Sequence, residues 1–261
     1  MGESPYILYR ELPARALTAR NLEDYALCPQ KYLLSFFQPP GETERTLGGP
    51  AVLHQAVRAA LIELYRQGGP PAIPPEKLKE LFEARWDGRA CADSREEEEL
   101  HRLGLRILCQ YHERHVAEPV QTLASDLRME AEIGGYRFVA VADRVDEQPE
   151  GNVTLLRYRT TLRPPGAGEL SRDLSARMLW LVGERHWGRP VRVAAEALRR
   201  GKVILAEFPA AVRRETEERL VRQAQEIRRA TDFPPRQGKH CRHCRSRPRC
   251  PAWQGARERP A

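Results

Sequence analysis

Residues 129–147 read MEAEIGGYRFVAVADRVDE, and residues 155–161 read LLRYRTT. Both stretches are rich in Val, Leu and aromatic residues, and turn residues interrupt the region at Gly134-Gly135 and at 148–151. Such runs, separated by short turns, predict a meander of three neighbouring strands. The strands are expected over 127–132, 136–146 and 152–161.

Apolar residues recur at helical spacing on both sides of this meander. Helices are expected over 17–37, 51–65, 76–86, 94–116, 174–186 and 210–231, a hairpin over 191–208, and loops over 38–50 and 162–169. This order predicts an α/β fold with a mixed central sheet flanked by helices. We expect a single domain over 1–261, comprising a mainly helical part (17–126), a core (127–235) and a basic tail (236–261).

The composition is that of an ordinary soluble globular protein, with 41% hydrophobic, 30% charged and 7% aromatic residues. No apolar run approaches the roughly 20 residues of a membrane span, and the N-terminus does not resemble a signal peptide. Membrane, collagen-like and wholly disordered classes are therefore excluded, and we expect a cytoplasmic protein.

The basic excess is local. The net charge is +7, and residues 236–261 hold eight basic residues and one acid, so the preceding residues sum to zero. A basic patch of this kind favours contact with nucleic-acid phosphates. The side chains expected to provide it are Arg242, Arg245, Arg247 and Arg249. The alternative is that they balance the charge of anionic thiolates nearby, and the 38 arginines against five lysines show that arginine is used heavily throughout.

Three of the six cysteines form a C-x2-C-x5-C pattern at Cys241, Cys244 and Cys250. A reducing compartment makes disulfides unexpected, whereas a CxxC pair places two thiolates where both can reach one metal centre. The fourth ligand could be His240 or His243 in a zinc site, or Cys28, which precedes a proline 213 residues before Cys241. A third alternative is three unconnected thiols.

Four segments, in order, resemble the PD-(D/E)XK nuclease superfamily in its iron–sulfur branch, which includes AddB/RecB-like and CRISPR-adaptation nucleases. LTARNLEDYALCPQKYLLSFF resembles the opening helix with the first cluster cysteine, and LGGPAVLHQAVRAAL resembles the G-x-x-x-H helix, with one extra residue before His54. MEAEIGGYRFVAVADRVDE resembles the strand pair ending G-x-I-D-R-I-D, and FPPRQGKHCRHCRSRPRC resembles the closing cluster motif. The resemblance implies a [4Fe–4S] cluster on Cys28, Cys241, Cys244 and Cys250.

The departure from the family lies at the catalytic strand. These nucleases continue into a strand close to I-V-D-Y-K-T, whose acid holds Mg²⁺ or Mn²⁺ together with the Asp of the preceding strand. Here Asp143 is present, but Arg157 and Arg159 stand at the acid and lysine positions. The Q-x-x-x-Y helix that follows is also eroded. The resemblance therefore implies a degenerate catalytic set of His54, Asp143, Arg157 and Arg159.

Elementary chemistry makes this departure serious. Asp143 and Arg157 are each seven residues from Glu150, so a regular hairpin places them opposite each other, about 5 Å apart. Arginine has no lone pair for a metal, and Arg159 stays protonated because its pKa exceeds about 12. We expect Arg157 to occupy the place of the lost metal against Asp143.

Four other acids lie close enough in sequence to restore a metal site, and His54 is a further candidate ligand if it is not simply a packing residue. The acids are Glu130, Glu132, Asp146 and Glu147. We expect an iron–sulfur DNA-binding protein without catalysis, a subunit of a repair, recombination or defence assembly beside a helicase. The alternatives are an active metal-dependent exo- or endonuclease with a relocated acid, and a pure interaction module.

Overall fold

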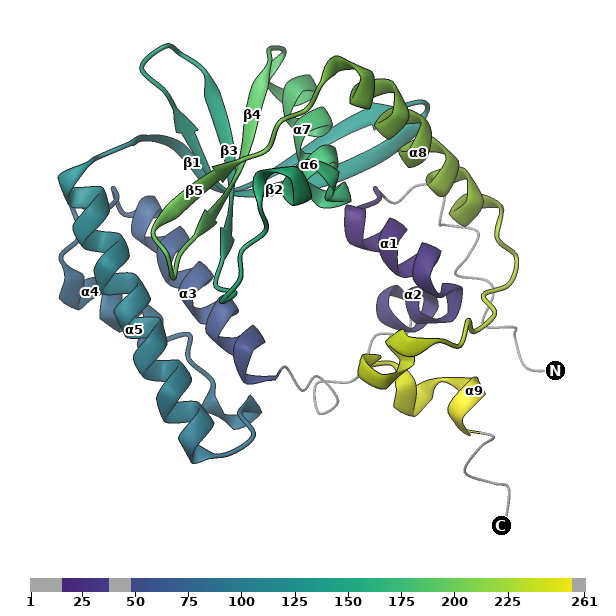
Figure 1. Cartoon of the computed structure of the whole chain (residues 1–261), viewed down its shortest axis with the longest axis horizontal. Coiled ribbons are helices and arrows are strands. Elements are labelled where there is room, and N and C mark those ends of the chain that lie inside the picture. Colours follow the sequence, from purple (N-terminus) through teal and green to yellow (C-terminus); the bar gives the residue numbers. More distant parts are fainter. Residues whose placement is uncertain (1–15, 38–47, 255–261) are drawn as a thin grey trace. The chain divides into compact units, whose positions relative to one another are not determined.

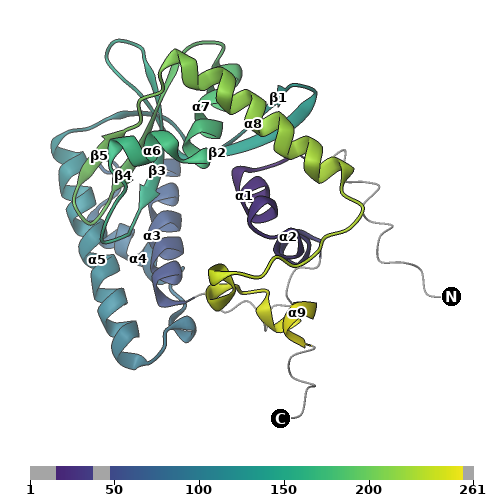
Figure 2. The ribbon, with the colours of Figure 1, turned by 45° about the vertical axis from the view of Figure 1, so that its right-hand side comes forward.

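The computed structural model describes residues 16–37 and 48–254. The loop expected over 38–50 lies mostly outside them, as do Arg257 and Arg259 of the tail. The described chain forms two compact units, each assembled from separate stretches of sequence. Unit 1 combines residues up to 45 with 130–139 and 210–261, and unit 2 combines 46–129 with 140–209. Figures 1 and 2 show their elements.

The sheet of unit 2 is mixed, as the sequence predicts. Its five strands lie in the order β1 (Gln121–Ile133), β2 (Tyr136–Glu147), β3 (Val153–Arg159), β4 (Val191–Ala197) and β5 (Lys202–Leu205). β2 and β3 are antiparallel, β3 and β4 are parallel, and β4 and β5 are antiparallel. The distal ends of β1 and β2 belong to unit 1. A parallel pair needs a crossover, which the helices between β3 and β4 supply.

Those helices are α6 (Ala167–Arg172) and α7 (Leu174–Trp187). Gly183 of α7 allows the helix to approach the sheet closely, because a Cβ atom there would overlap Leu155 of β3. The sequence predicts α7 but not α6, which begins inside the expected loop at 162–169. Gly166 precedes α6, and Glu169 accepts a hydrogen bond from its backbone N–H, so a local cap starts this short helix.

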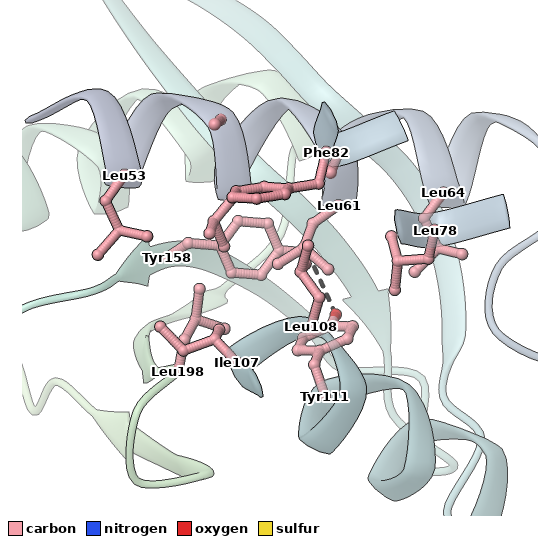
Figure 3. Close-up of a cluster of buried hydrophobic side chains, with 13 residues drawn as sticks. Leu53, Leu61, Leu64, Leu78, Phe82, Ile107, Leu108, Tyr111, Tyr158 and Leu198 are labelled. Atoms are coloured by element: carbon pink, nitrogen blue, oxygen red, sulfur yellow. Dashed lines mark hydrogen bonds between the residues drawn. The ribbon is translucent and has the colours of Figure 1, made fainter. Parts of the chain in front are cut away.

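Three further helices pack together in unit 2: α3 (Gly49–Arg66), α4 (Pro75–Glu83) and α5 (Ser94–Ala117), with a short 3-10 turn, η3 (Gly88–Ala90), between α4 and α5. Their shared core is drawn in Figure 3 and includes Phe82, Ile107 and Tyr111. Tyr158 of β3 belongs to the same cluster and is fully buried. Tyr158 therefore anchors β3 to the helices α3, α4 and α5.

Unit 1 begins with two helices, because the helix expected over 17–37 is interrupted at Cys28, before Pro29. α1 (Ala19–Leu27) and α2 (Pro29–Phe36) are separated at Cys28, whose backbone is extended because Pro29 disfavours the helical conformation in the residue before it. α8 (Ala210–Arg229) contacts α1. Tyr32 of α2 stacks on Phe233, with ring centroids 6.0 Å apart.

The tail that follows α8 is folded into short turns. It contains η4 (Lys239–His243), η5 (Arg247–Arg249) and α9 (Pro251–Gln254). Within residues 16–37 and 48–254, no helix has the length and apolar character of a membrane span.

Candidate functional site

The carboxylate expected to be catalytic sits where β2 pairs with β3. Arg144 pairs with Leu156, and the same register one residue earlier places Asp143 opposite Arg157, as the sequence predicts. Asp143 is 2% exposed, and its Oδ2 lies 3.6 Å from Nε of Arg157. Because side chains alternate along a strand, Arg157 and Arg159 share one face of β3.

A second arginine, not foreseen in the sequence, is closer to this carboxylate. Nε of Arg58 donates to Oδ1 of Asp143 at 2.7 Å, and Nη2 of Arg58 donates to Oδ1 of Asp126 at 2.5 Å. The remaining oxygen of Asp143 accepts the backbone N–H of Tyr158 at 2.7 Å. The ion pair expected between Arg157 and Asp143 is present, but Arg58 is closer to the carboxylate because α3 carries it there. Its one sequence signal is its place one helical turn after His54.

His54 lies half-buried beside the same group, with Nδ1 3.3 Å from the hydroxyl of Thr160. Burial lowers its pKa, and although Asp143 opposes this, Arg159, Arg58 and Arg157 lower the pKa further. His54 is consequently neutral at pH 7.

Arg159 has a different environment from its neighbours. Burial lowers the pKa of its guanidinium, and repulsion from Arg157 lowers it further. Nη1 donates to the carbonyl of Tyr158 at 3.4 Å, and no carboxylate of the described residues forms an ion pair with it. Arg159 thus carries positive charge without an anionic partner in contact.

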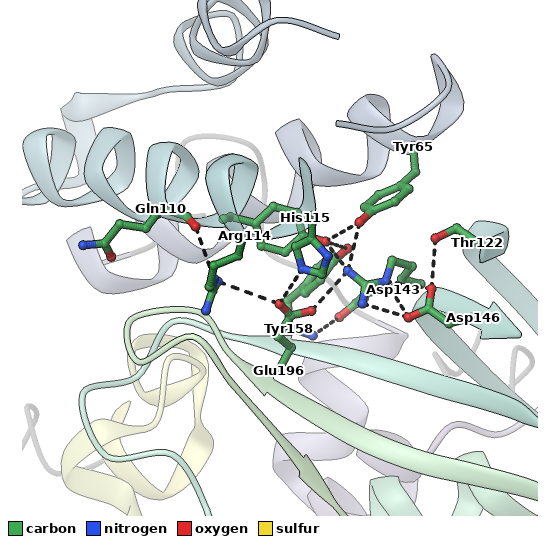
Figure 4. Close-up of polar contacts among 11 residues, drawn as sticks. Tyr65, Gln110, Arg114, His115, Thr122, Asp143, Asp146, Tyr158 and Glu196 are labelled. Atoms are coloured by element: carbon green, nitrogen blue, oxygen red, sulfur yellow. Dashed lines mark hydrogen bonds and ion pairs between the residues drawn. The ribbon is translucent and has the colours of Figure 1, made fainter. Parts of the chain in front are cut away.

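The opposite face of these strands holds a buried polar network, drawn in Figure 4. Arg144, 1% exposed, forms ion pairs with Asp146 at 2.8 Å and with Glu196 at 3.2 Å, and donates to the hydroxyl of Tyr111. His115 contacts Glu196 at 3.1 Å. A cavity of about 430 Å³ adjoins this network.

Four cysteines from distant parts of the sequence line one small pocket in unit 1: Cys28, Cys241, Cys244 and Cys250. The backbone N–H of Arg236 donates to Sγ of Cys28 at 3.3 Å. Burial raises the pKa of the Cys250 thiol, a backbone hydrogen bond from Ala252 lowers it, and the other three thiols raise it again. The other two cysteines, Cys91 and Cys109, belong to unit 2.

Two of the four tail arginines are held by neighbouring groups. Nη2 of Arg249 donates to the carbonyl of Leu34 at 3.1 Å, and the guanidinium of Arg247 stacks 4.0 Å from the ring centroid of Trp253. Arg242 and Arg245 are exposed. The expected phosphate surface therefore divides: Arg249 ties the tail to α2, while Arg242 and Arg245 face solvent.

Comparison with known proteins supplies the family. The model of the PD-(D/E)XK nuclease superfamily matches residues 16–251, nearly the whole chain. The chain belongs to this superfamily. A crystal structure of a provisionally named exonuclease from Eubacterium rectale matches with a TM-score of 0.55 and 10% identity, covering 93% of this chain and 92% of that one. At this identity the likeness concerns the fold alone.

A second crystal structure, of the protein SSO0001, matches with a TM-score of 0.36 and 15% identity, covering 86% of this chain and 94% of that one. No curated protein matches the sequence.

The divalent metal of the PD-(D/E)XK superfamily does not fit the residues at Asp143. Mg²⁺ needs several oxygen ligands, yet the two oxygens of Asp143 already face Arg58, Arg157 and the backbone N–H of Tyr158. The position opposite on β3 is an arginine instead of an acid. We derive no step through a metal at this site.

The acids considered as replacements are engaged or exposed. Asp146 is buried against Arg144, and Glu147 accepts from Gln121 and Arg189 at the sheet edge. Glu130 and Glu132 are exposed residues of unit 1. Asp126, which the sequence did not indicate, is the acid connected to Asp143, because Arg58 donates a hydrogen bond to each of them.

Proposed function

We propose that this protein is a DNA-binding member of the PD-(D/E)XK superfamily whose nuclease site grips the phosphate backbone without cutting it. One observation carries the proposal: the retained carboxylate, Asp143, is enclosed by guanidinium groups where the superfamily places a metal and a second acid. Without a metal there is no activated water and no Lewis acid for the phosphodiester.

The same arginines favour phosphate as the ligand. Arg58, Arg66 and Arg157 contact the two carboxylates, and the nearby Arg159 repels Arg157, so the group has a surplus of two positive charges. Arg157 is 32% exposed and Arg159 has no carboxylate in contact among the described residues. A guanidinium binds phosphate oxygens in a bidentate fashion, so these two side chains are the proposed phosphate contacts. The exposed Arg242 and Arg245 are proposed as further ones.

We also propose that Cys28, Cys241, Cys244 and Cys250 hold a [4Fe–4S] cluster. The donor set fits, because four thiolates are the ligands of such clusters and the pocket lining includes Lys31, Arg236 and Arg247 but no acid. Thiolates bind a single zinc as well as a cluster, so the metal content of the protein distinguishes the two.

The cluster would act structurally, by joining the tail to the first two helices. Anaerobic protein should be brown, with broad absorbance near about 400 nm from the thiolate-bound iron. Cys28→Ser should lose iron, whereas the matched change Cys109→Ser, outside the pocket, should retain it. Colourless protein with stoichiometric zinc would exclude the cluster.

The proposed setting is a DNA-processing assembly of the AddB/RecB-like kind, in the reducing cytoplasm. A chain that grips DNA without cutting it would act beside a helicase, on an end or a displaced single strand. Pull-down with a purified AddB/RecB-like helicase, with and without DNA, tests this partnership.

The deciding experiment combines binding and cleavage. Fluorescence anisotropy on labelled single- and double-stranded DNA should show binding that weakens steeply with salt, in proportion to about four neutralised phosphates. Incubation with Mg²⁺ or Mn²⁺ should leave the DNA intact for wild type and Asp143→Ala alike. Cleavage by wild type that disappears in Asp143→Ala would overturn the proposal in favour of a relocated acid, and absence of both activities would leave an interaction module.

A further inference from the structure

Two carboxylates on neighbouring strands face one guanidinium in unit 2. Asp126 lies on β1 and Asp143 on β2, and Arg58 of α3 donates to one oxygen of each, at 2.5 Å and 2.7 Å. The two bonds use different nitrogens of the same planar group. Arg58 therefore bridges the two acids as a shared cation would.

Asp126 is held toward this position by an unusual backbone. Its φ is +54°, and it is the one described residue other than glycine with a positive φ. Such a conformation costs free energy in an L-residue with a side chain. The ion pairs with Arg58 and Arg66 are contacts that stabilise it there.

The bridge is buried at Asp143 and partly exposed at Arg58 and Asp126. The side chain of Asp143 is 2% exposed, that of Arg58 is 29% exposed and that of Asp126 is 35% exposed. Although burial lowers the pKa of Arg58, attraction and hydrogen bonding to Asp143 and Asp126 outweigh it and raise the pKa. The guanidinium is therefore permanently charged, and its positive charge is neutralised by two acids.

We propose that Arg58 is a tethered cation that takes the place of a divalent metal between Asp126 and Asp143 and keeps that metal out. Asp126 is then the second carboxylate of the site, supplied by β1 instead of β3. This inference rests on the loss of the metal that the proposed function assumes, and it is independent of DNA binding.

Arg58, and not Arg157, is the blocking residue for a geometric reason. Nε of Arg157 lies 3.6 Å from Oδ2 of Asp143 and has no hydrogen-bond partner among the residues that the structure describes, and its Nη1 donates to the carbonyl of Val141 at 3.3 Å. It reaches one acid only. Removing Arg157 leaves the Arg58 bridge intact, whereas removing Arg58 frees Oδ1 of both Asp126 and Asp143.

Arg66, the second arginine that contacts Asp126, leaves Oδ1 of Asp126 available to a metal once Arg58 is truncated. Nη2 of Arg66 lies 3.5 Å from Oδ2 of Asp126, the oxygen that Arg58 does not use, and its side chain is 55% exposed. With Arg58 truncated, two carboxylate oxygens and water can surround a hard cation such as Mn²⁺.

The test is Mn²⁺ binding to DNA-free protein, followed by electron paramagnetic resonance of free Mn²⁺ and by the Mn²⁺-dependent shift in melting temperature. Wild type should bind Mn²⁺ only weakly at this site, because the Arg58 guanidinium occupies it. Arg58→Ala should bind one Mn²⁺ at least about tenfold more tightly than wild type, equivalent to about 1.4 kcal/mol. Arg58→Ala with Asp126→Asn should lose that binding, and Arg157→Ala, the matched control, should behave as wild type.

Arg58→Gln serves if Arg58→Ala does not fold, because it keeps most of the side chain while removing the charge. Failure of both variants to bind Mn²⁺, or binding that survives Asp126→Asn, would overturn the inference. So would equal gain from Arg157→Ala. None of these outcomes changes the DNA-binding result for wild type, so failure of this inference is distinguishable from failure of the proposed function.

Discussion

Both faces of β2 and β3 carry arginines beside carboxylates, but the two groups have different roles. On one face, the buried Arg144 forms ion pairs with Asp146 and Glu196, and Arg114 lies 4.0 Å from Glu196, so two cations face two acids. On the other face, Asp143 is surrounded by arginines that are partly exposed and outnumber the acids. The first arrangement, the balanced face, supplies its own counter-charges, so we expect its role to be structural. The second retains charge for an external anion.

The largest effect is expected on the balanced face. Arg144→Ala should lower the free energy of unfolding by about 3–5 kcal/mol, because it leaves Asp146 and Glu196 buried without their cation. Urea denaturation measures this. The matched control is Arg192→Ala, an exposed arginine of β4, which should change stability by less than about 0.5 kcal/mol. Equal effects of the two would show that the Arg144 network is not a stabilising unit.

On the Asp143 face, by contrast, a substitution should change DNA affinity more than stability. Arg159→Ala should weaken DNA binding by about 1–2 kcal/mol and reduce the slope of log K against log salt by about 1, because one phosphate contact is lost. Its stability should stay near that of wild type. Anisotropy titrations at several salt concentrations, with Arg200→Ala as an exposed control, test this. Unchanged affinity would remove Arg159 from the interface.

Acid should destabilise the balanced face through Glu196. Burial alone would raise its pKa, but the hydrogen bond from His115 and the charge of Arg144 lower it below the ordinary value of 4.5. Its contribution is therefore present above pH 4.5 and lost as the pH falls below that value. Between pH 5 and pH 3, the free energy of unfolding of wild type should fall by about 1 kcal/mol more than that of Glu196→Gln. Urea titrations at the two pH values measure this difference. Parallel curves would contradict the assignment.

The smallest effect is expected from His54. Because its pKa is lowered in the folded state, the unfolded chain binds more protons as the pH falls below 6.5, and stability decreases there. His54→Gln should flatten the stability curve between pH 7 and pH 5 by roughly 0.5–1 kcal/mol, whereas His101→Gln, at an exposed contact with Glu83, serves as the control. A curve for His54→Gln that matches wild type would exclude this titration.

The local part of this site could be predicted from the sequence. The turn at 148–151 fixes the register of β2 and β3, and the register alone places Asp143 against Arg157. Arg58 and Asp126 could not be predicted in the same way, because a helix and a third strand bring them to Asp143 from 85 and 17 residues away. An arginine on a helix and an acid on a strand carry no signal of their own until tertiary packing joins them.

The ends of helices and strands were likewise predictable only where the signal lies in the local sequence. β1 begins at Gln121, six residues before the expected strand, because β2 supplies partners for a stretch with little apolar alternation. Conversely, Pro29 marks the end of α1 in the sequence itself. The sequence does not place Cys28 beside the tail, because their proximity in one pocket depends on packing within unit 1. Which metal, if any, the four cysteines hold stays a prediction.

The pocket that joins Cys28 to Cys241 also sets an order of events in the cell. The two residues are separated by 213 positions. At roughly 5–20 residues per second, translation needs about 10–40 s to cover that distance. During this interval α1 and α2 have left the ribosome while the tail that completes their unit does not yet exist. Unit 2, whose stretches end at Pro209, is synthesised before the tail. Unit 1 must therefore close last, and a ribosome stalled before residue 241 leaves the Cys28 thiol, which is buried in the folded unit, without the tail that lines its pocket.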